Sequence, residues 1–123
     1  MTTVTPTDDR TTTTPAATMI GLAAPSEGST EISTWRVEMQ ADSPSPEHSI
    51  DREQVWMPIS GSFLFTIEGI ETSVPAGAAV IVPADAVRRF VADGGPAEAL
   101  VCMPAGGTAG LPGGGRQPLP WAS

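Results

Sequence analysis

The sequence predicts an all-β protein, and three observations carry that prediction. Segments in which apolar and polar residues alternate with a period of two recur through the middle of the chain. Turns rich in Gly, Pro, Ser and Asp separate these segments at intervals of roughly 8–12 residues. No segment has the apolar periodicity of a helix of about ten residues or more. Roughly six to eight short strands with this spacing indicate an antiparallel sandwich or barrel.

The clearest strand is expected at 30–40, TEISTWRVEMQ. Its alternation predicts a buried face formed by Ser33, Trp35, Val37 and Met39. The next two strands are expected at 54–59 and 62–67, and the Ser60-Gly61 turn between them predicts a β-hairpin. Further strands are expected at 70–74, 78–82, 88–92 and 98–103.

The two ends of the chain have a different composition. Residues 1–18 are rich in Thr, Pro and Asp with almost no large apolar side chain, so we expect a disordered tail. Residues 104–123 form an extension dominated by Gly and Pro, which contributes little packing. The folded unit is then 19–103, and a core of ~85 residues buries only about 60–65% of the surface of its unfolded chain. Association into a homodimer would compensate, and we expect one.

Charge and composition restrict the partners and the chemistry. The formal net charge is −8, so the chain lacks the basic surface that nucleic acids and anionic membranes require. No apolar run reaches the length of a signal peptide or a membrane span. The single cysteine, Cys102, excludes an intramolecular disulfide and is typical of the reducing cytoplasm. The absence of lysine and tyrosine excludes Schiff-base catalysis and a phenolic acid or base.

Two segments resemble the motifs of the cupin family. The segment 48–61, HSIDREQVWMPISG, resembles the first motif, in which His-x-His, a later Glu and a closing Gly provide three metal ligands. His48 stands at the first ligand position, Ile50 at the second and Gln54 at the glutamate, while Gly61 matches the glycine. The motif positions are therefore present, but two of these three ligands are replaced.

The segment 77–89, GAAVIVPADAVRR, resembles the second cupin motif. Gly77 and Pro83 match it, Asp85 replaces a glycine and Arg88 replaces the last histidine ligand. The resemblance is to small single-domain cupins, similar to stand-alone cupins of high-GC bacteria, with degenerate metal-binding motifs. It implies a double-stranded β-helix, or jelly-roll barrel, with its pocket inside.

The same register predicts a pocket lined by His48, Gln54 and Arg88. Arg88 is expected to bind a carboxylate or enolate through its guanidinium, and His48 to move a proton, so both are candidate catalytic residues. Gln54 would orient the substrate. For Arg88 two alternatives stay open: a register slip that turns Arg89 inward instead, and a purely structural ion pair with a neighbouring carboxylate, Glu38 or Asp85.

Two tryptophans, Trp35 and Trp56, are candidates for stacking on a planar substrate, and a place in the core or at a dimer interface is the alternative. Cys102, between apolar neighbours, is expected to be a small buried residue rather than a nucleophile.

Three functions follow from these residues. The first is a metal-independent isomerase or cyclase acting on a small carboxylated or enolisable metabolite. The second is a non-catalytic module that binds such a metabolite as a sensor or carrier. The third is a residual divalent-metal site held by His48, Gln54 and carboxylates from elsewhere, although a single histidine and the charge of Arg88 argue against a metal cofactor. In the first two of these functions the ligand is a small molecule.

Overall fold

The computed structural model describes residues 1–111 and 113–123, and the all-β prediction is confirmed: no α-helix occurs among these residues. Short 3₁₀ turns lie at η1 (Asp8–Arg10), η2 (Pro25–Glu27) and η3 (Pro120–Ala122). No helix in this described part is long and apolar enough to cross a membrane. The strands are β1 (Thr11–Thr13), β2 (Thr18–Gly21), β3 (Ile32–Met39), β4 (Ser49–Ile50), β5 (Gln54–Ser60), β6 (Ser62–Ile67), β7 (Ile70–Pro75), β8 (Val80–Val82), β9 (Arg88–Ala92), β10 (Ala97–Pro104), β11 (Thr108–Gly110) and β12 (Arg116–Pro118).

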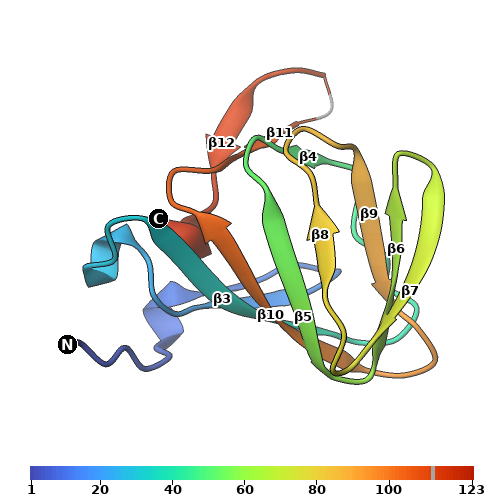
Figure 1. Ribbon diagram of the computed structural model, residues 1–123, viewed down its shortest axis with the longest axis horizontal. Helices are drawn as coiled ribbons and strands as arrows, with labels where there is room; N and C mark the ends of the chain where they lie inside the picture. The colour runs from blue at the N-terminus through green and yellow to red at the C-terminus, as the bar shows by residue number, and fades with distance from the viewer. Residues whose placement is uncertain (112) are drawn as a thin grey trace.

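The strands form two layers (Figure 1). One layer is a six-stranded sheet in the order β1-β2-β3-β10-β5-β8. The other is made of two three-stranded sheets, β12-β11-β4 and β7-β6-β9. An antiparallel bridge between His48 and Arg88 connects these two small sheets. Two residues singled out by the sequence motifs therefore lie where the second layer is joined.

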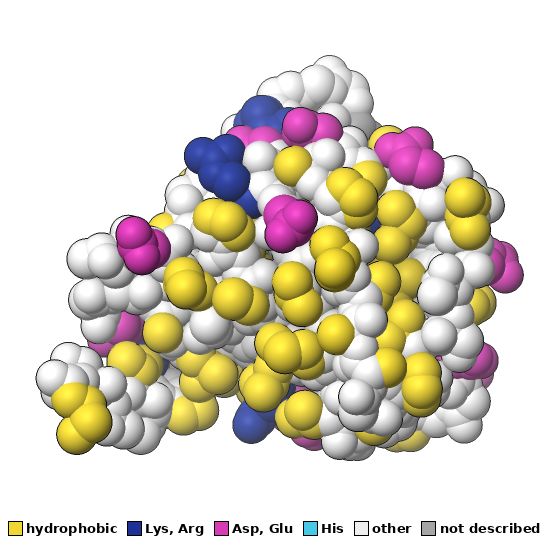
Figure 2. Space-filling model, in the orientation of Figure 1, with side chains coloured by type: hydrophobic (Ala, Val, Ile, Leu, Met, Phe, Trp, Pro, Cys, Tyr) yellow, Lys and Arg dark blue, Asp and Glu magenta, His cyan; other side chains and the backbone are white. Residues whose placement is uncertain are grey.

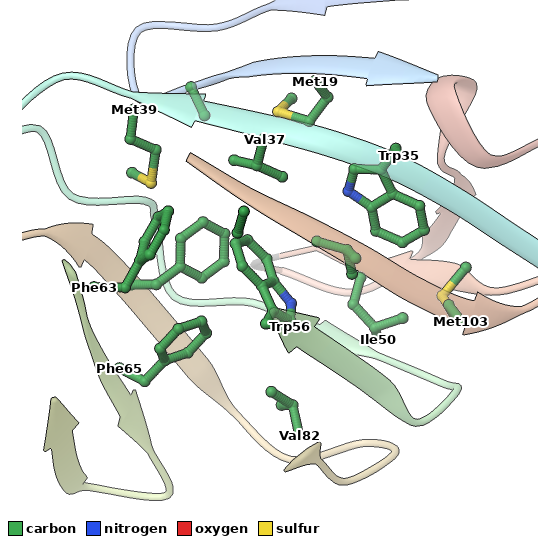
Figure 3. Close-up of a cluster of buried hydrophobic side chains, with 14 of the residues drawn as sticks. Met19, Trp35, Val37, Met39, Ile50, Trp56, Phe63, Phe65, Val82 and Met103 are labelled. Carbon is green, nitrogen blue, oxygen red and sulfur yellow. The ribbon is translucent and has the colours of Figure 1, made fainter. Parts of the chain in front are cut away.

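The strand predictions hold for the middle of the chain. The buried residues of β3 are the four that the alternation placed inside, Ser33, Trp35, Val37 and Met39. Strand β9 has the predicted bounds, and β10 contains the predicted 98–103. The side chains of the two layers meet in a core centred on Trp56 (Figure 3). Its ring centroid lies 5.8 Å from that of Phe63, 5.1 Å from that of Phe65 and 4.4 Å from that of Phe90.

The predicted hairpin between β5 and β6 is wrong. Strand β5 pairs with β10 and β8, whereas β6 pairs with β7 and β9, so the two strands belong to different layers. Gly61 lies between them with a φ of 71°, and a Cβ there would collide with the carbonyl oxygen of Pro96. The turn therefore carries the chain from one layer to the other. Alternation and turn residues identify strands, but they do not identify partners.

The disordered N-terminal tail is also wrong. Thr11 to Thr13 pair with Thr18 to Ile20, and β2 continues the sheet onto β3. Arg10 anchors the segment: its guanidinium donates to the carbonyl oxygens of Gly21 at 3.2 Å and Leu22 at 2.8 Å, and its Nε lies 2.9 Å from a carboxylate oxygen of Glu27. Backbone pairing and these polar contacts order a segment that has few apolar side chains, and threonine favours strands.

The C-terminal extension differs from its expected role as a poorly packed segment. Strand β11 pairs with β4 and β12, and Leu119 and Ala122 are buried in the core. The hydroxyl of Ser33 donates to the carbonyl oxygen of Ala122 at 2.6 Å. Both chain ends therefore pack against the 19–103 unit, and both contribute walls to the cavity described next.

Candidate functional site

A cavity of about 430 Å³ lies between the layers. It is bounded by β2 and β3, by β4 and β5, by the N-terminal segment around Thr12 and Thr14, and by the C-terminal segment. Most of its larger lining side chains are apolar or aromatic: Met19, Trp35, Val37, Ile50, Trp56, Phe90, Leu119 and Trp121. Figure 3 shows Trp35, Ile50 and Trp56 among the side chains between the layers. Such a wall suits a planar apolar molecule.

His48 lies at the polar edge of this cavity. Its ring packs edge-on against Phe90, with centroids 5.7 Å apart, and its Nδ1 lies 2.9 Å from the carbonyl oxygen of Pro46. A carbonyl only accepts, so Nδ1 carries the proton and Nε2 keeps its lone pair. Burial lowers the pKa of His48 below its ordinary value; the bond to Pro46 opposes this shift and the charge of Arg88 adds to it. The imidazole is therefore neutral near pH 7, with Nε2 available as a base.

His48 also lines a second hollow, an open groove of about 520 Å³ on the outside of β4 and β11. Glu47, Gly110 and Leu111 line both spaces as well. The imidazole thus stands between the groove and the interior cavity.

Gln54 is a buried polar residue in the cavity wall. Its Oε1 accepts hydrogen bonds from the indole Nε1 of Trp56 at 3.1 Å and from NH1 of Arg88 at 3.2 Å. Two donors at one atom identify that atom as the oxygen, so the amide orientation is fixed. Among the described residues, the amide Nε2 has one hydrogen-bond partner, the sulfur of Met103 at 3.6 Å. Thioether sulfur is a weak acceptor, so this donor can be recruited by a ligand oxygen.

Arg88 is 1% exposed, and its three nitrogens donate to different oxygens. Nε bonds to the carbonyl of Ala86 at 3.0 Å, NH2 to that of Pro83 at 3.0 Å, and NH1 to Gln54. Burial lowers the pKa of Arg88 to about 10, opposed by the charge of Asp85. The side chain is still protonated at neutral pH, and it carries a buried positive charge.

The register slip did not occur, because Arg88 is inside and Arg89 is exposed. None of the ion pairs found among the described residues involves Arg88, so neither Glu38 nor Asp85 neutralises it directly. The guanidinium is not part of the cavity lining; it lies behind Gln54. Direct binding of an anionic substrate by Arg88 stays a prediction, and the geometry favours a role in positioning Gln54.

The two candidate tryptophans are both buried and both line the cavity. Trp56 is also the centre of the aromatic core, so the stacking and core interpretations coincide there. Cys102 is half-buried on the outward side of β10, which removes it from the site.

Comparison with known proteins connects this geometry to a fold. No protein-family model matches the chain, and no curated protein matches it. Among solved structures, the polyketide cyclase RemF from Streptomyces resistomycificus is 22% identical over 96% of this chain and 82% of that chain, with a TM-score of 0.73. An RmlC-like cupin from Shewanella frigidimarina is 14% identical over 76% and 79%, with a TM-score of 0.65. A cupin 2 domain-containing protein from Halorhodospira halophila is 15% identical over 73% and 65%, with a TM-score of 0.68.

This protein has the cupin fold. The resemblance of its two motifs is thus matched by its three-dimensional structure, and the motif positions that hold metal ligands elsewhere can be tested for fit. In this protein Ile50 is aliphatic and 2% exposed, and the carbonyl oxygen of Gln54 already accepts from Trp56 and Arg88. The guanidinium bonded to that oxygen would repel a cation.

No group of three or more His, Cys, Asp or Glu side chains suited to a metal ion occurs within residues 1–111 and 113–123. At the motif positions His48 is the one metal-ligating side chain that remains, whereas a divalent transition-metal ion usually has three or four protein ligands. The residues at the motif positions therefore do not fit a metal ion.

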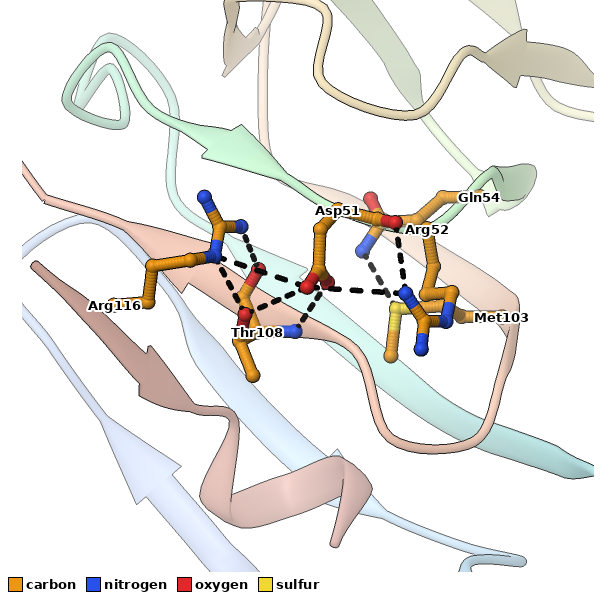
Figure 4. Close-up of polar contacts among 6 residues, drawn as sticks. All are labelled: Asp51, Arg52, Gln54, Met103, Thr108 and Arg116. Carbon is orange, nitrogen blue, oxygen red and sulfur yellow. Dashed lines mark hydrogen bonds and ion pairs between the residues drawn. The ribbon is translucent and has the colours of Figure 1, made fainter.

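A polar cluster next to the site connects the C-terminal segment to the end of β4 (Figure 4). The carboxylate of Asp51 accepts from the backbone N–H of Thr108 at 2.6 Å and from its hydroxyl at 2.9 Å, and Arg116 Nε donates to that hydroxyl oxygen at 2.7 Å. The Thr108 N–H is the main cause that lowers the pKa of Asp51. This cluster holds β11 and β12 against the end of β4, and so fixes the wall that faces His48.

Several lining residues were not anticipated from the sequence. Leu119 and Trp121 lie in the Gly/Pro-rich extension, and Thr12 and Thr14 lie in the segment taken for a tail. One signal was available for the first pair: they are large apolar side chains in a segment otherwise made of small residues. No comparable signal marks the threonines.

Proposed function

We propose that this cupin binds a planar, largely apolar and enolisable small molecule in its interior cavity and catalyses proton transfer on it, as an isomerase or cyclase does. The observation that carries the proposal is the combination of an aromatic cavity with one neutral imidazole at its edge. The ligand would lie between tryptophan and phenylalanine side chains, where offset and edge-on contacts with a flat ring system are favourable.

The charge distribution supports an enolisable or phenolic ligand over a carboxylate. None of the described residues that line the interior cavity is an arginine, whereas Glu47 is one of them. The nearest buried positive charge is on Arg88, whose guanidinium already donates hydrogen bonds to Gln54 and two backbone carbonyls. A full negative charge in the cavity would therefore lack a direct partner and would carry a desolvation cost. A developing enolate, which needs one directed hydrogen bond, suits the site better.

The proposed chemistry uses three residues. Nε2 of His48 takes a proton from a carbon that is next to a carbonyl group or conjugated with it; the C–H bond breaks and its electron pair moves onto the carbonyl oxygen. The amide Nε2–H of Gln54 donates to that oxygen. Arg88 polarises the same amide from behind, because a donor bonded to Oε1 strengthens the N–H donors of the group. Return of the proton to another carbon completes an isomerisation. In a cyclisation the carbanion forms a C–C bond to a second carbonyl carbon, the C=O π electrons move onto that oxygen, and the oxygen takes the proton back from His48.

The neighbour RemF is a polyketide cyclase, and polyketides are rich in enolisable carbonyl groups and flat rings. At 22% identity this supports the proposal only through the shared fold. A carrier or sensor with the same cavity is the alternative, and the test separates the two.

Anthrone is a suitable probe because it is a flat tricyclic ketone that enolises by losing a proton from the carbon opposite its carbonyl. We expect the wild-type protein to bind it, measured by quenching of tryptophan fluorescence, and to accelerate exchange of that proton for deuterium, measured by NMR. His48→Gln should keep the affinity within about threefold and lose roughly 100-fold or more of the exchange rate.

Anthracene-9-carboxylate is the matched charged probe. Preference for it over anthrone would contradict the proposal and restore direct anion binding by Arg88. Binding of anthrone without exchange would leave a carrier or sensor. Failure to bind either flat molecule would overturn the assignment of the cavity.

A further inference from the structure

A row of three residues in the outer groove lies on the side of β4, β11 and β12 that faces away from the cavity. Ser49 on β4 is the register partner of Gly110 on β11, and Gly110 is the partner of Arg116 on β12. The next pair along the strands, Ile50 and Ala109, is buried and lines the cavity. Because successive residues of a strand point to opposite faces, the row of Ser49, Gly110 and Arg116 faces the groove, and all three line it.

Gly110 leaves the middle of this row open. A Cβ at Gly110 would lie 2.7 Å from Oγ of Ser49 and 3.1 Å from NH1 of Arg116, so these two polar atoms converge on the space above the glycine. Among the described residues, Arg116 donates side-chain hydrogen bonds through Nε and NH2, and neither its NH1 nor the hydroxyl of Ser49 takes part in one. Two donors are therefore directed at one space that no side chain fills.

The other contacts of Arg116 hold its guanidinium in this position. Nε donates to the hydroxyl of Thr108 at 2.7 Å and NH2 to the carbonyl oxygen of Thr108 at 2.6 Å, while a carboxylate oxygen of Asp51 lies 3.7 Å from Nε. Figure 4 shows the guanidinium with its third nitrogen outside these contacts. The side chain is thus ordered before a ligand arrives, which reduces the entropy lost on binding.

The surrounding charges favour a single carboxylate over a more highly charged group. Figure 2 shows arginine and acidic side chains close together in the region where β4, β11 and β12 lie in Figure 1. Asp51 offsets part of the charge of Arg116, and Glu47 also lines the groove. Because its net charge is −8, the protein repels a phosphate more strongly than a carboxylate. One charged N–H and one hydroxyl match the two oxygens of a carboxylate.

We propose that Ser49 and Arg116 bind a carboxylate at the end of a flexible side chain of the ligand, while the flat ring system of the same ligand occupies the cavity. This inference rests on the proposed function, and it narrows the substrate class to enolisable ring compounds with an acidic tail. The cavity and the groove share His48 among their lining residues, so a tail that leaves the cavity beside the imidazole enters the groove.

The distance to be spanned by this tail is short. His48 directly precedes Ser49, and neighbouring strands lie about 4.8 Å apart, so the carboxylate would lie roughly 5–10 Å from the imidazole. The negative charge then stays outside the apolar cavity, beside Arg116. A carboxylate attached directly to the ring cannot reach this position.

Two matched probes test the proposal. The first, 4-(anthracen-9-yl)butanoate, carries a flat ring and a carboxylate on a short saturated chain, and the second is its uncharged methyl ester. Fluorescence anisotropy near pH 8 measures the affinity of each probe. We expect the wild type to bind the acid at least about tenfold more tightly than the ester. Arg116→Gln should reduce this ratio to below about twofold, and Ser49→Ala should reduce it about threefold.

Arg52→Gln is the matched control. NH1 of Arg52 lies 3.8 Å from a carboxylate oxygen of Asp51, but Arg52 is not among the described residues that line the groove. This variant should keep the acid-to-ester ratio of the wild type. Circular dichroism verifies folding, because Arg116→Gln also alters the contacts with Thr108. The Ser49 hydroxyl has no such contact, so Ser49→Ala keeps the proposal testable if Arg116→Gln does not fold.

The outcomes separate this inference from the proposed function. Equal affinity of the wild type for acid and ester, with anthrone still bound, would overturn the carboxylate site and leave the proposed function intact. A ratio that survives in both Arg116→Gln and Ser49→Ala, or that falls equally in Arg52→Gln, would overturn the site as well. Loss of anthrone and ester binding, with binding of the acid that still depends on Arg116, would overturn the cavity assignment and retain the carboxylate site.

Discussion

NH1 of Arg88 donates a hydrogen bond to Oε1 of Gln54 at 3.2 Å across a sequence separation of 34 residues. Both residues stand where the cupin motifs place metal ligands. The two replacements therefore complement each other, because the guanidinium of Arg88 donates to the amide oxygen of Gln54. Since Oε1 also accepts from Trp56, a change at Arg88 reaches the cavity wall through Gln54.

Arg88→Lys should destabilise the protein by about 1–3 kcal/mol, because a single ammonium cannot reproduce the planar fork that reaches three oxygens and leaves buried carbonyl groups without donors. Urea unfolding monitored by tryptophan fluorescence measures the difference. Arg89→Lys is the matched control on the exposed side of the same strand, and it should change stability by no more than about 0.5 kcal/mol. Equal effects at both positions would contradict the positioning role.

His48 should make stability depend on pH near neutrality. Its folded pKa lies below the ordinary 6.5, so the unfolded chain binds a proton more readily than the folded protein. The free energy of unfolding therefore falls as the pH drops below about 6.5 and is unaffected by this group above it, with a slope of at most about 1.4 kcal/mol per pH unit.

Urea unfolding of wild type and His48→Gln between pH 5.5 and 8 isolates this contribution, since all other groups are common to both proteins. The variant should gain stability relative to the wild type only on the acidic side. A difference that is constant with pH would show that the imidazole is not held neutral by burial.

Asp51 should act in the opposite part of the pH range. Its pKa is lowered, chiefly by the N–H of Thr108, so its contribution is complete above the ordinary 3.8 and is lost as the pH falls through the lower folded value. Asp51→Asn should lower the melting temperature at pH 7, and its difference from the wild type should shrink as the pH falls below the ordinary 3.8. The exposed Asp93→Asn should show no such convergence, because it begins with no deficit.

The sequence was sufficient for the strands and insufficient for their partners. Alternation placed Trp35 and Val37 inside correctly, because a buried face imposes period two locally. It failed at Gly61, because the choice between a hairpin and a crossing depends on contacts with Pro96, which is distant along the chain. Motif register placed Arg88 inside, but two of its three acceptors are backbone carbonyl groups, and these leave no trace in the sequence.

The ordered N-terminal segment yields a direct test of the cavity walls. Deleting residues 2–16 removes β1 and the lining residues Thr12 and Thr14, and should open the cavity to water. We expect stronger binding of the dye ANS and a loss of roughly 2 kcal/mol or more, from several backbone hydrogen bonds at about 0.5–1.5 kcal/mol each. Deleting residues 2–4 spares Thr5, whose carbonyl accepts from Arg10, and should change neither. A disordered tail would make the two deletions equivalent.

Ala109→Leu should fill part of the cavity from the wall that the C-terminal segment provides. Ala109 is buried on β11, lines the cavity and is paired with Ile50. Added methyl groups in an apolar void are favourable or neutral for stability when space exists, so the melting temperature should hold or rise. Affinity for anthrone should fall at least about tenfold, or about 1.4 kcal/mol. Ala79→Leu adds the same atoms at an exposed position and should leave affinity unchanged. Undiminished binding in Ala109→Leu would place the ligand elsewhere, with the outer groove beside His48 as the next position to test.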